Sequence, residues 1–121
     1  MGRIQGDLKD RTFAFALSIL NVSDEFPNSP KGWIVGKQFI RCGTSIGANI
    51  READQAFSAA DFAHKCNTAL KEATETDYWL RLSIQGGLLA RESTVAIAAE
   101  VEQLIRILVT VVKRTQLALE S

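Results

Sequence analysis

Three glutamates are the residues best suited to metal chemistry in this sequence. Glu72 and Glu75 lie three positions apart on one predicted helix, and Glu52 lies on the helix before it. Helical bundles that hold two iron ions combine glutamates from two helices with a Glu-x-x-His motif from each of two others. The single histidine, His64, does not follow any glutamate by three positions. We therefore expect these acids to pair with basic and amide side chains across a helix interface, and we expect no metal or other cofactor.

The sequence gives less support to a catalytic nucleophile or to a phosphate-binding loop. A catalytic cysteine needs a neighbouring base, but His64 and Cys66 are two positions apart, which places them roughly 200° apart around a helix. Gly36 and Lys37 lack the remaining residues of a phosphate-binding loop, and no strand precedes them. The sequence therefore predicts a protein that is not an enzyme.

The elements that would position these residues are helices, because apolar residues recur at steps of three and four along the chain. Pro27 and Pro30 interrupt the first pattern, since proline lacks an amide donor. Ser58 resembles the N-cap of a third helix, and Gly86-Gly87 resembles its C-terminal cap. The four predicted helices span residues 7–26, 31–57, 59–85 and 91–119.

A stripe of apolar residues marks the face of each helix that we expect to be buried. Gly36, Gly43 and Gly47 lie in the interior of the second helix, where each costs roughly 1 kcal/mol relative to alanine, so we expect another helix to approach closely there. The stripes, in chain order, are Leu8, Thr12, Phe15, Ala16 and Ile19; Trp33, Gly36, Ile40, Gly43, Gly47, Ile50 and Phe57, widened by Phe39, Ile46 and Ala53; Phe62, Cys66, Ala69, Ala73 and Leu80; and Ile97, Val101, Leu104, Leu108, Val112 and Thr115.

Four helices with short connections predict an all-α fold, an antiparallel up-and-down four-helix bundle formed by one domain over residues 1–121. The tight turn near Ser58 sets the register of the second and third helices. That register places Cys42 and Cys66 too far apart for a disulfide. It also predicts a polar layer between the two helices, made of Arg41, Ser45, Asn49, Arg51, Glu52, Glu72 and Glu75.

The charge balance limits the classes of partner. Lys and Arg number 14, as do Asp and Glu, so the chain of 121 residues has no net charge. A neutral domain lacks the basic surface typical of nucleic-acid binding, so we expect at most weak contact with RNA or DNA. No apolar run reaches the roughly 20 residues of a membrane span, and the chain does not begin with a signal peptide. We expect a cytoplasmic protein with no membrane partner.

The last predicted helix is apolar over a wider face than one bundle core can cover. Its residues 104–112 are almost all aliphatic. Soluble monomers rarely expose apolar patches beyond a few hundred Å², and a neutral chain has little repulsion to keep such patches apart. We therefore expect a homo-oligomer, with an interface that includes Trp79, Leu82, Ile107 and Val109.

Two stretches resemble a known family, S-I-G-A-N-I-R-E-A at residues 45–53 and K-E-A-T-E-T-D-Y-W-L at residues 71–80. With further matching segments, the chain resembles the bacterial rRNA intervening-sequence protein family over nearly its whole length. The resemblance implies a four-helix bundle that assembles into a homopentameric ring. A related branch, the accessory proteins of diversity-generating retroelements, binds nucleic acid and a reverse transcriptase.

These observations lead to one main hypothesis and one alternative. The main hypothesis is a non-enzymatic homo-oligomeric bundle, pentameric by the resemblance, that acts as a binding or scaffold module. The alternative is an RNA- or DNA-binding protein whose basic patches become continuous only in the oligomer.

Overall fold

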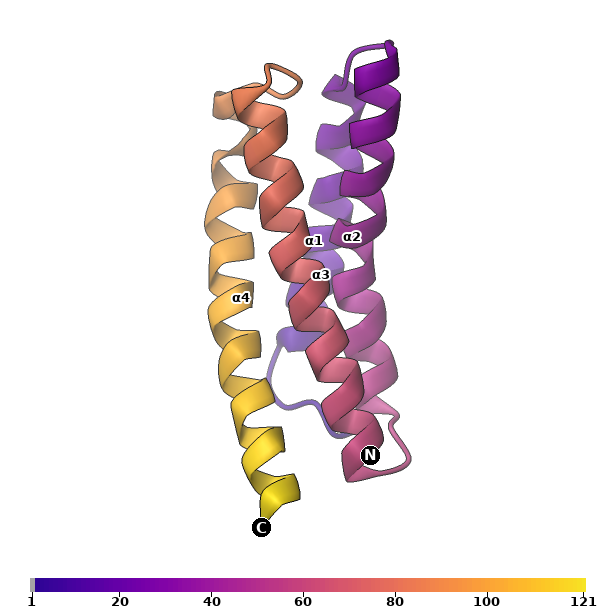
Figure 1. Cartoon of the computed structure of the whole chain (residues 1–121), viewed down its shortest axis with the longest axis vertical. Helices are drawn as coiled ribbons and strands as arrows, with labels where there is room; N and C mark the ends of the chain where they lie inside the picture. Colours follow the sequence, from indigo (N-terminus) through magenta and orange to yellow (C-terminus); the bar gives the residue numbers. More distant parts are fainter. Residues whose placement is uncertain (1) are drawn as a thin grey trace.

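Four long helices make up almost all of the computed structural model, which describes residues 2–121 and leaves Met1 outside. The described residues contain no strand, which confirms the all-α fold. None of the helices in this part of the chain is long and apolar enough to cross a membrane. The helices lie along one common long axis (Figure 1) and are α1 (Leu8–Val22), α2 (Pro30–Asp54), α3 (Ala59–Gln85) and α4 (Arg91–Glu120), with a short 3-10 helix, η1 (Ser23–Glu25), after α1.

Each helix returns along the one before it, as the chain colours in Figure 1 show. Arg41 near the middle of α2 pairs with Glu75 of α3, whereas Glu52 near the end of α2 pairs with Lys65 near the start of α3. The helices pack in the order α1, α2, α3, α4, and α1 makes a smaller contact with α4. Each helix therefore packs against two others, the helices before and after it around the bundle.

The ends of α3 follow the capping signals of the sequence. The Ser58 hydroxyl accepts the amide N–H of Asp61 at 3.0 Å, which satisfies one of the free donors of the first turn. Gly87, just after the helix, has φ 76°, a left-handed conformation that glycine adopts without steric cost. The predicted boundaries of this helix, residues 59–85, are confirmed.

The buried stripes of α1, α3 and α4 lie largely where they were predicted, but the stripe of α2 is rotated. Trp33 is 60% exposed, and Phe57 is 89% exposed because α2 has already ended at Asp54. The prediction placed Trp33 at the centre of the buried face and treated Phe39 and Ile46 as its margin. The buried residues of α2 are instead Gly32, Gly36, Phe39, Cys42, Gly43, Ile46, Ile50, Ala53 and Asp54.

The glycines of α2 allow α1 to approach closely, as the sequence predicted. A Cβ added at Gly43 would lie 2.7 Å from Cγ1 of Ile19, and one added at Gly47 would lie 3.1 Å from the carbonyl oxygen of Thr12. Real Cβ atoms essentially never lie as close to a neighbour as at Gly43, and the distance at Gly47 is also tighter than most real Cβ contacts. The helix that approaches these glycines is therefore α1.

A buried carboxylate at the end of α2 holds the segment that precedes α1. The two carboxylate oxygens of Asp54 accept the amide N–H of Ile4 at 2.7 Å and the ammonium group of Lys9 at 2.8 Å. The amide N–H of Arg3 donates to the carbonyl of Asp54 at 3.0 Å. The hydrogen bond from Lys9, followed by that from Ile4, lowers the pKa of Asp54 below its ordinary value. This segment has no helical periodicity, so the sequence patterns did not predict its position.

We expect Gly43→Ala to lower the free energy of unfolding by about 1–2 kcal/mol. Overpacking a core costs about 1–3 kcal/mol, and the better helix propensity of alanine returns at most about 1 kcal/mol. The Ile19 side chain cannot easily move away, because it is fully buried. Urea unfolding followed by circular dichroism measures the change. The same substitution should cost less in an Ile19→Ala background, and strictly additive effects would contradict the close approach.

Candidate functional site

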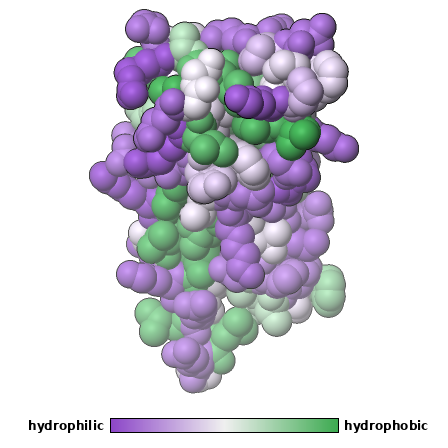
Figure 2. All heavy atoms as spheres, turned by 45° about the horizontal axis from the view of Figure 1, so that its top comes forward, coloured by the Kyte–Doolittle hydropathy of each residue, from purple (hydrophilic) through white to green (hydrophobic). Residues whose placement is uncertain are grey.

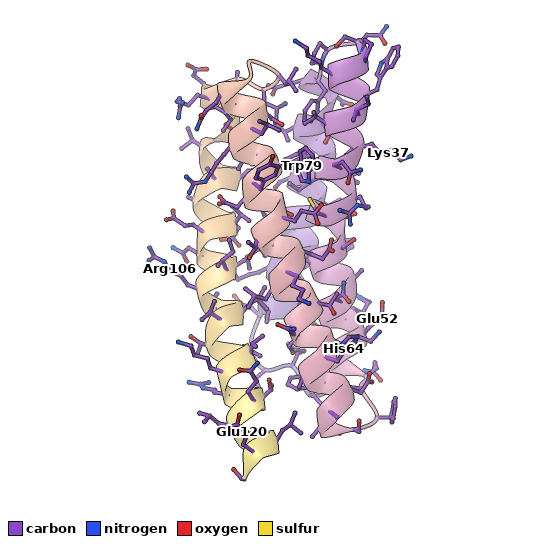
Figure 3. All side chains as sticks on the ribbon, viewed as in Figure 1. Lys37, Glu52, His64, Trp79, Arg106 and Glu120 are labelled. Atoms are coloured by element: carbon purple, nitrogen blue, oxygen red, sulfur yellow. The ribbon has the colours of Figure 1, made fainter. Side chains whose placement is uncertain are left out.

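A cluster of ion pairs joins the outer sides of α2 and α3. The guanidinium of Arg41 donates to Glu72 at 3.3 Å and also to Glu75. The same Glu75 carboxylate accepts the indole N–H of Trp79 at 3.0 Å. Figure 3 shows Trp79 on the α3 ribbon, well above Glu52 and His64 in that view. We call Arg41, Glu72, Glu75 and Trp79 the polar cluster.

The other residues of the predicted polar layer lie outside this cluster. Glu52 pairs separately with Lys65 at 2.7 Å, toward the other end of the two helices. The Ser45 hydroxyl donates to the carbonyl of Arg41 at 2.6 Å, and the Asn49 amide donates to the carbonyl of Ser45 at 2.8 Å. Both of these side chains therefore bond to their own helix. The structure brings together only part of the predicted layer.

Arg51 lies on a different side of α2 from the polar cluster. Its side chain lines a hollow shared with α1, and none of residues 2–121 forms an ion pair with it. Ten residues along a helix correspond to a rotation about 80° short of three full turns, so Arg51 does not share the face of Arg41. The prediction placed both in one layer by their level along the helix and did not consider this rotation.

The thiols of the chain are poorly suited to nucleophilic chemistry. Cys42 and Cys66 are both free and buried. Burial raises the pKa of each thiol, and that of Cys66 reaches about 11. Because the thiolate is the reactive form, both groups are weak nucleophiles near neutral pH. Within residues 2–121 no group of three or more His, Cys, Asp or Glu side chains could hold a metal ion.

An apolar groove runs between α1 and α2 on the outside of the bundle. Phe13, Leu17 and Leu20 form one stripe along α1 and are 58%, 48% and 48% exposed. The hollow beside them measures about 440 Å³. We call it the α1–α2 groove, and its lining residues are Lys9, Phe13, Ala16, Leu17, Leu20, Thr44, Gly47, Ala48 and Arg51. Sequence reasoning missed this surface, although its signal was a second apolar stripe on the predicted first helix.

A second apolar patch lies on α3 beside the polar cluster. Tyr78 is 58% exposed, and its ring meets the ring of Trp79 edge-on with centroids 5.1 Å apart. Leu82, one turn further along, is 41% exposed. We call Tyr78, Trp79 and Leu82 the α3 patch. Figure 2 shows how apolar side chains lie in patches between hydrophilic ones on one face of the molecule.

Three of the four predicted interface residues are less exposed than expected. Trp79, Ile107 and Val109 are half-buried, and Trp79 and Ile107 pack against the core of their own bundle. Ile107 also lines a hollow together with Ile4 and Phe62, so the segment that precedes α1 lies over this part of α4. Exposed large apolar side chains also lie in groups on α1, where they are Phe13, Leu17 and Leu20, and on α3, where they are Tyr78 and Leu82.

Trp33 lies at a further hollow near the start of α2. The hollow measures about 610 Å³ and is also lined by Phe26, Lys37 and Ile40. The indole N–H of Trp33 donates to the side-chain oxygen of Asn28 at 2.8 Å, which fixes the ring at the surface. Lys37 points away from the bundle in Figure 3.

Comparison with known proteins identifies a family and a similar solved structure. A family model described as 23S rRNA-intervening sequence protein matches residues 6–110. A crystal structure from Bacteroides thetaiotaomicron, described as a protein with unknown function from the S23 ribosomal protein family, is 44% identical with a TM-score of 0.80. The alignment covers 88% of this chain and 98% of that one. No curated protein matches the chain.

We expect Arg41→Met to lower the free energy of unfolding by about 1 kcal/mol, near the upper end for partly exposed ion pairs. The substitution leaves Glu72, whose side chain is only 17% exposed, without its cation. Arg106→Met is the matched control, because Arg106 and Glu102 are 79% and 61% exposed and 3.8 Å apart. That control should change stability by less than about 0.5 kcal/mol in urea unfolding. Equal losses in the two variants would show that the polar cluster contributes no more than a surface pair.

Proposed function

The chain belongs to the 23S rRNA-intervening sequence protein family, and we propose that it acts as a non-enzymatic, homo-oligomeric binding or scaffold module. The apolar surface of the α1–α2 groove is the observation that carries this proposal. Three large side chains of one helix are about half exposed or more there, next to a hollow lined mostly by apolar residues. A monomer would leave this surface in water, and self-association would remove it.

The net charge of the chain supports association. Lys and Arg balance Asp and Glu at 14 each, so copies of the chain do not repel one another through their overall charge. The resemblance to the family implies five copies in a ring. A ring requires an interface in which one patch of each copy meets a different patch of the next.

The described side chains support a role without catalysis. The acids of the polar cluster are occupied by Arg41, and both thiols are buried with raised pKa values. A catalytic nucleophile such as a thiol must lie within hydrogen-bond reach of a base. The described side chains therefore suit the binding of a partner better than they suit catalysis.

RNA or DNA binding is the alternative function. Eight cationic side chains within residues 2–121 form no ion pair and could contact phosphates. They are distributed over the segment before α1 and over α2, α3 and α4, so an oligomer would be needed to bring them into one continuous surface. These residues are Arg3, Lys31, Lys37, Arg51, Lys71, Arg91, Lys113 and Arg114.

We expect Leu17→Glu to convert the assembly into a monomer of 13.3 kDa without loss of helical content. Leu17 is 48% exposed at the centre of the α1 stripe, so a carboxylate there costs little in the monomer but would be buried in the interface. Val95→Glu is the matched control, since Val95 is an exposed aliphatic residue on α4 outside the groove. Sedimentation velocity and circular dichroism measure both variants. A wild-type protein that sediments as a monomer would overturn the proposed function.

Binding to RNA separates the main proposal from the alternative. A neutral chain should bind a fluorescently labelled RNA weakly, and the affinity should fall as salt rises, because contacts between cationic side chains and phosphates release counterions from the RNA. The Leu17→Glu variant provides the comparison with unassembled protein. Tight binding at physiological salt that is lost in this variant would favour the alternative, in which basic patches join in the oligomer.

A further inference from the structure

We propose that residues 2–5 form a lid over one end of the bundle, and that the carboxylate of Asp54 is the latch that keeps this lid shut. The lid opens and closes while the four helices stay packed. In Figure 1 the segment crosses the end of the bundle where the turn between α2 and α3 lies. A lid of this kind belongs to each single chain, so it goes beyond the proposed function and does not depend on the number of copies in an assembly.

The lid is bonded to the bundle at one place. The amide N–H of Ile4 donates to Oδ1 of Asp54 at 2.7 Å, and the amide N–H of Arg3 donates to the carbonyl oxygen of Asp54 at 3.0 Å. The guanidinium Nε of Arg3 donates to the carbonyl oxygen of Ala56 at 2.9 Å. Within the described chain, residues 2–5 thus form hydrogen bonds only with residues 54–56, and loss of these bonds releases the lid as a unit.

The carboxylate of Asp54 suits a latch because its two oxygens serve two different parts of the chain. Oδ1 accepts the bond from the lid, whereas Oδ2 accepts the ammonium group of Lys9 in α1 at 2.8 Å. The Asp54 side chain is only 3% exposed, and a Cβ added at Gly2 would overlap its carboxylate, so the backbone of the lid lies directly against the latch. When the lid opens, Lys9 still compensates the negative charge, and no buried carboxylate is left without a partner.

Gly6 provides a hinge between the lid and α1. Its φ of 69° lies in the left-handed region, which glycine enters without steric cost. Apart from its chain neighbours, no atom of the described residues lies within 4 Å of the place where its Cβ would stand. Gln5 and Asp7 on either side are exposed, and the Asp7 side chain does not cap α1. The chain can therefore bend at Gly6 without disturbing the first turn of α1.

The lid covers an apolar part of α3 and α4. Ile4, its one aliphatic side chain, is half-buried and packs against both buried clusters of the core. A hollow of about 370 Å³ lies between the lid and these helices, and its helical wall includes Phe62, Ile107 and Val111. Opening of the lid widens this hollow and uncovers these side chains. The lid thus controls the access of an apolar group to this end of the bundle.

Opening of the lid requires far less than unfolding of the bundle. The closed lid gains three hydrogen bonds and the partial burial of one aliphatic side chain, whereas unfolding would expose the whole core. Segments with few buried apolar contacts open locally, without the rest of a native protein. We therefore expect the lid to open many times for each unfolding of the four helices.

Asp54→Asn tests the latch, because a side-chain amide has one oxygen to accept from two donors, the N–H of Ile4 and the ammonium group of Lys9. The exchange rate of the Arg3 amide hydrogen, measured by NMR, reports the opening, since its acceptor is a backbone carbonyl that the variant keeps. This rate should rise about tenfold, because hydrogen bonds to charged groups are worth more than neutral ones. Ile4→Ala changes no helical residue and removes the apolar anchor of the lid, so it should also accelerate this exchange.

Gly43→Ala is the control, because it weakens the core far from the lid. The amide hydrogens in the middle of α4 should exchange faster in this variant and in low concentrations of urea, whereas exchange of the Arg3 amide should stay at the wild-type rate in both. Exchange of Arg3 that accelerates together with α4 would show that the segment opens only when the bundle unfolds, and would overturn the lid.

The two substitutions in the lid and its latch give the other decisive outcomes. A wild-type rate for the Arg3 amide in Asp54→Asn overturns the role of the carboxylate as the latch. Wild-type rates in both Asp54→Asn and Ile4→Ala overturn the lid itself, and this result also holds if Asp54→Asn does not fold and only Ile4→Ala can be measured. None of these outcomes changes the sedimentation of the wild-type protein, so failure of the lid leaves the proposed function intact.

Discussion

The close approach of α1 to α2 determines most of what the surface of this bundle presents. A Cβ at Gly47 would meet the backbone and the hydroxyl of Thr12, and one at Gly43 would meet the side chain of Ile19. This contact fixes which side of α1 faces inward, with Thr12 and Ile19 fully buried. The far side of the same helix is apolar as well, and Phe13, Leu17 and Leu20 stay about half exposed there beside small residues of α2. A small-residue contact inside the bundle therefore creates both the core packing and the exposed groove.

Sequence patterns predicted the helices better than the direction in which some of them face. The bounds of α3 and the buried stripe of α4 followed from capping residues and regular spacing. The predicted buried stripe of α2 is rotated about the helix axis relative to the observed one. Trp33 seemed a natural core residue, but Gly32 beside it is the residue that faces the interior. The segment before α1 could not be placed, since one hydrogen-bonded carboxylate, Asp54, fixes it and no repeating pattern does.

The candidate site was predictable to a similar extent. The register between α2 and α3 put Arg41 on a level neighbouring those of Glu72 and Glu75, and Arg41 pairs with both in the structure. Arg51 was misplaced, because a level along the axis does not specify the rotation about it. The groove on α1 was overlooked since its stripe has only three large residues and α4 appeared more apolar. In the structure, the segment around Ile4 packs beside that part of α4, and such a contact between distant parts of the chain has no local signal in the sequence.

The two buried cysteines give the bundle built-in reporters of local opening. Cys66 packs with Ala53 and Val112 at one end of the bundle, whereas Cys42 lies further along α2, with its thiol against the carbonyl of Phe39. A thiol reagent can reach neither group until the helices around it separate, and only the ionised thiol then reacts. The labelling rates of the two sites would therefore measure, without any engineered probe, whether the two regions open together or separately.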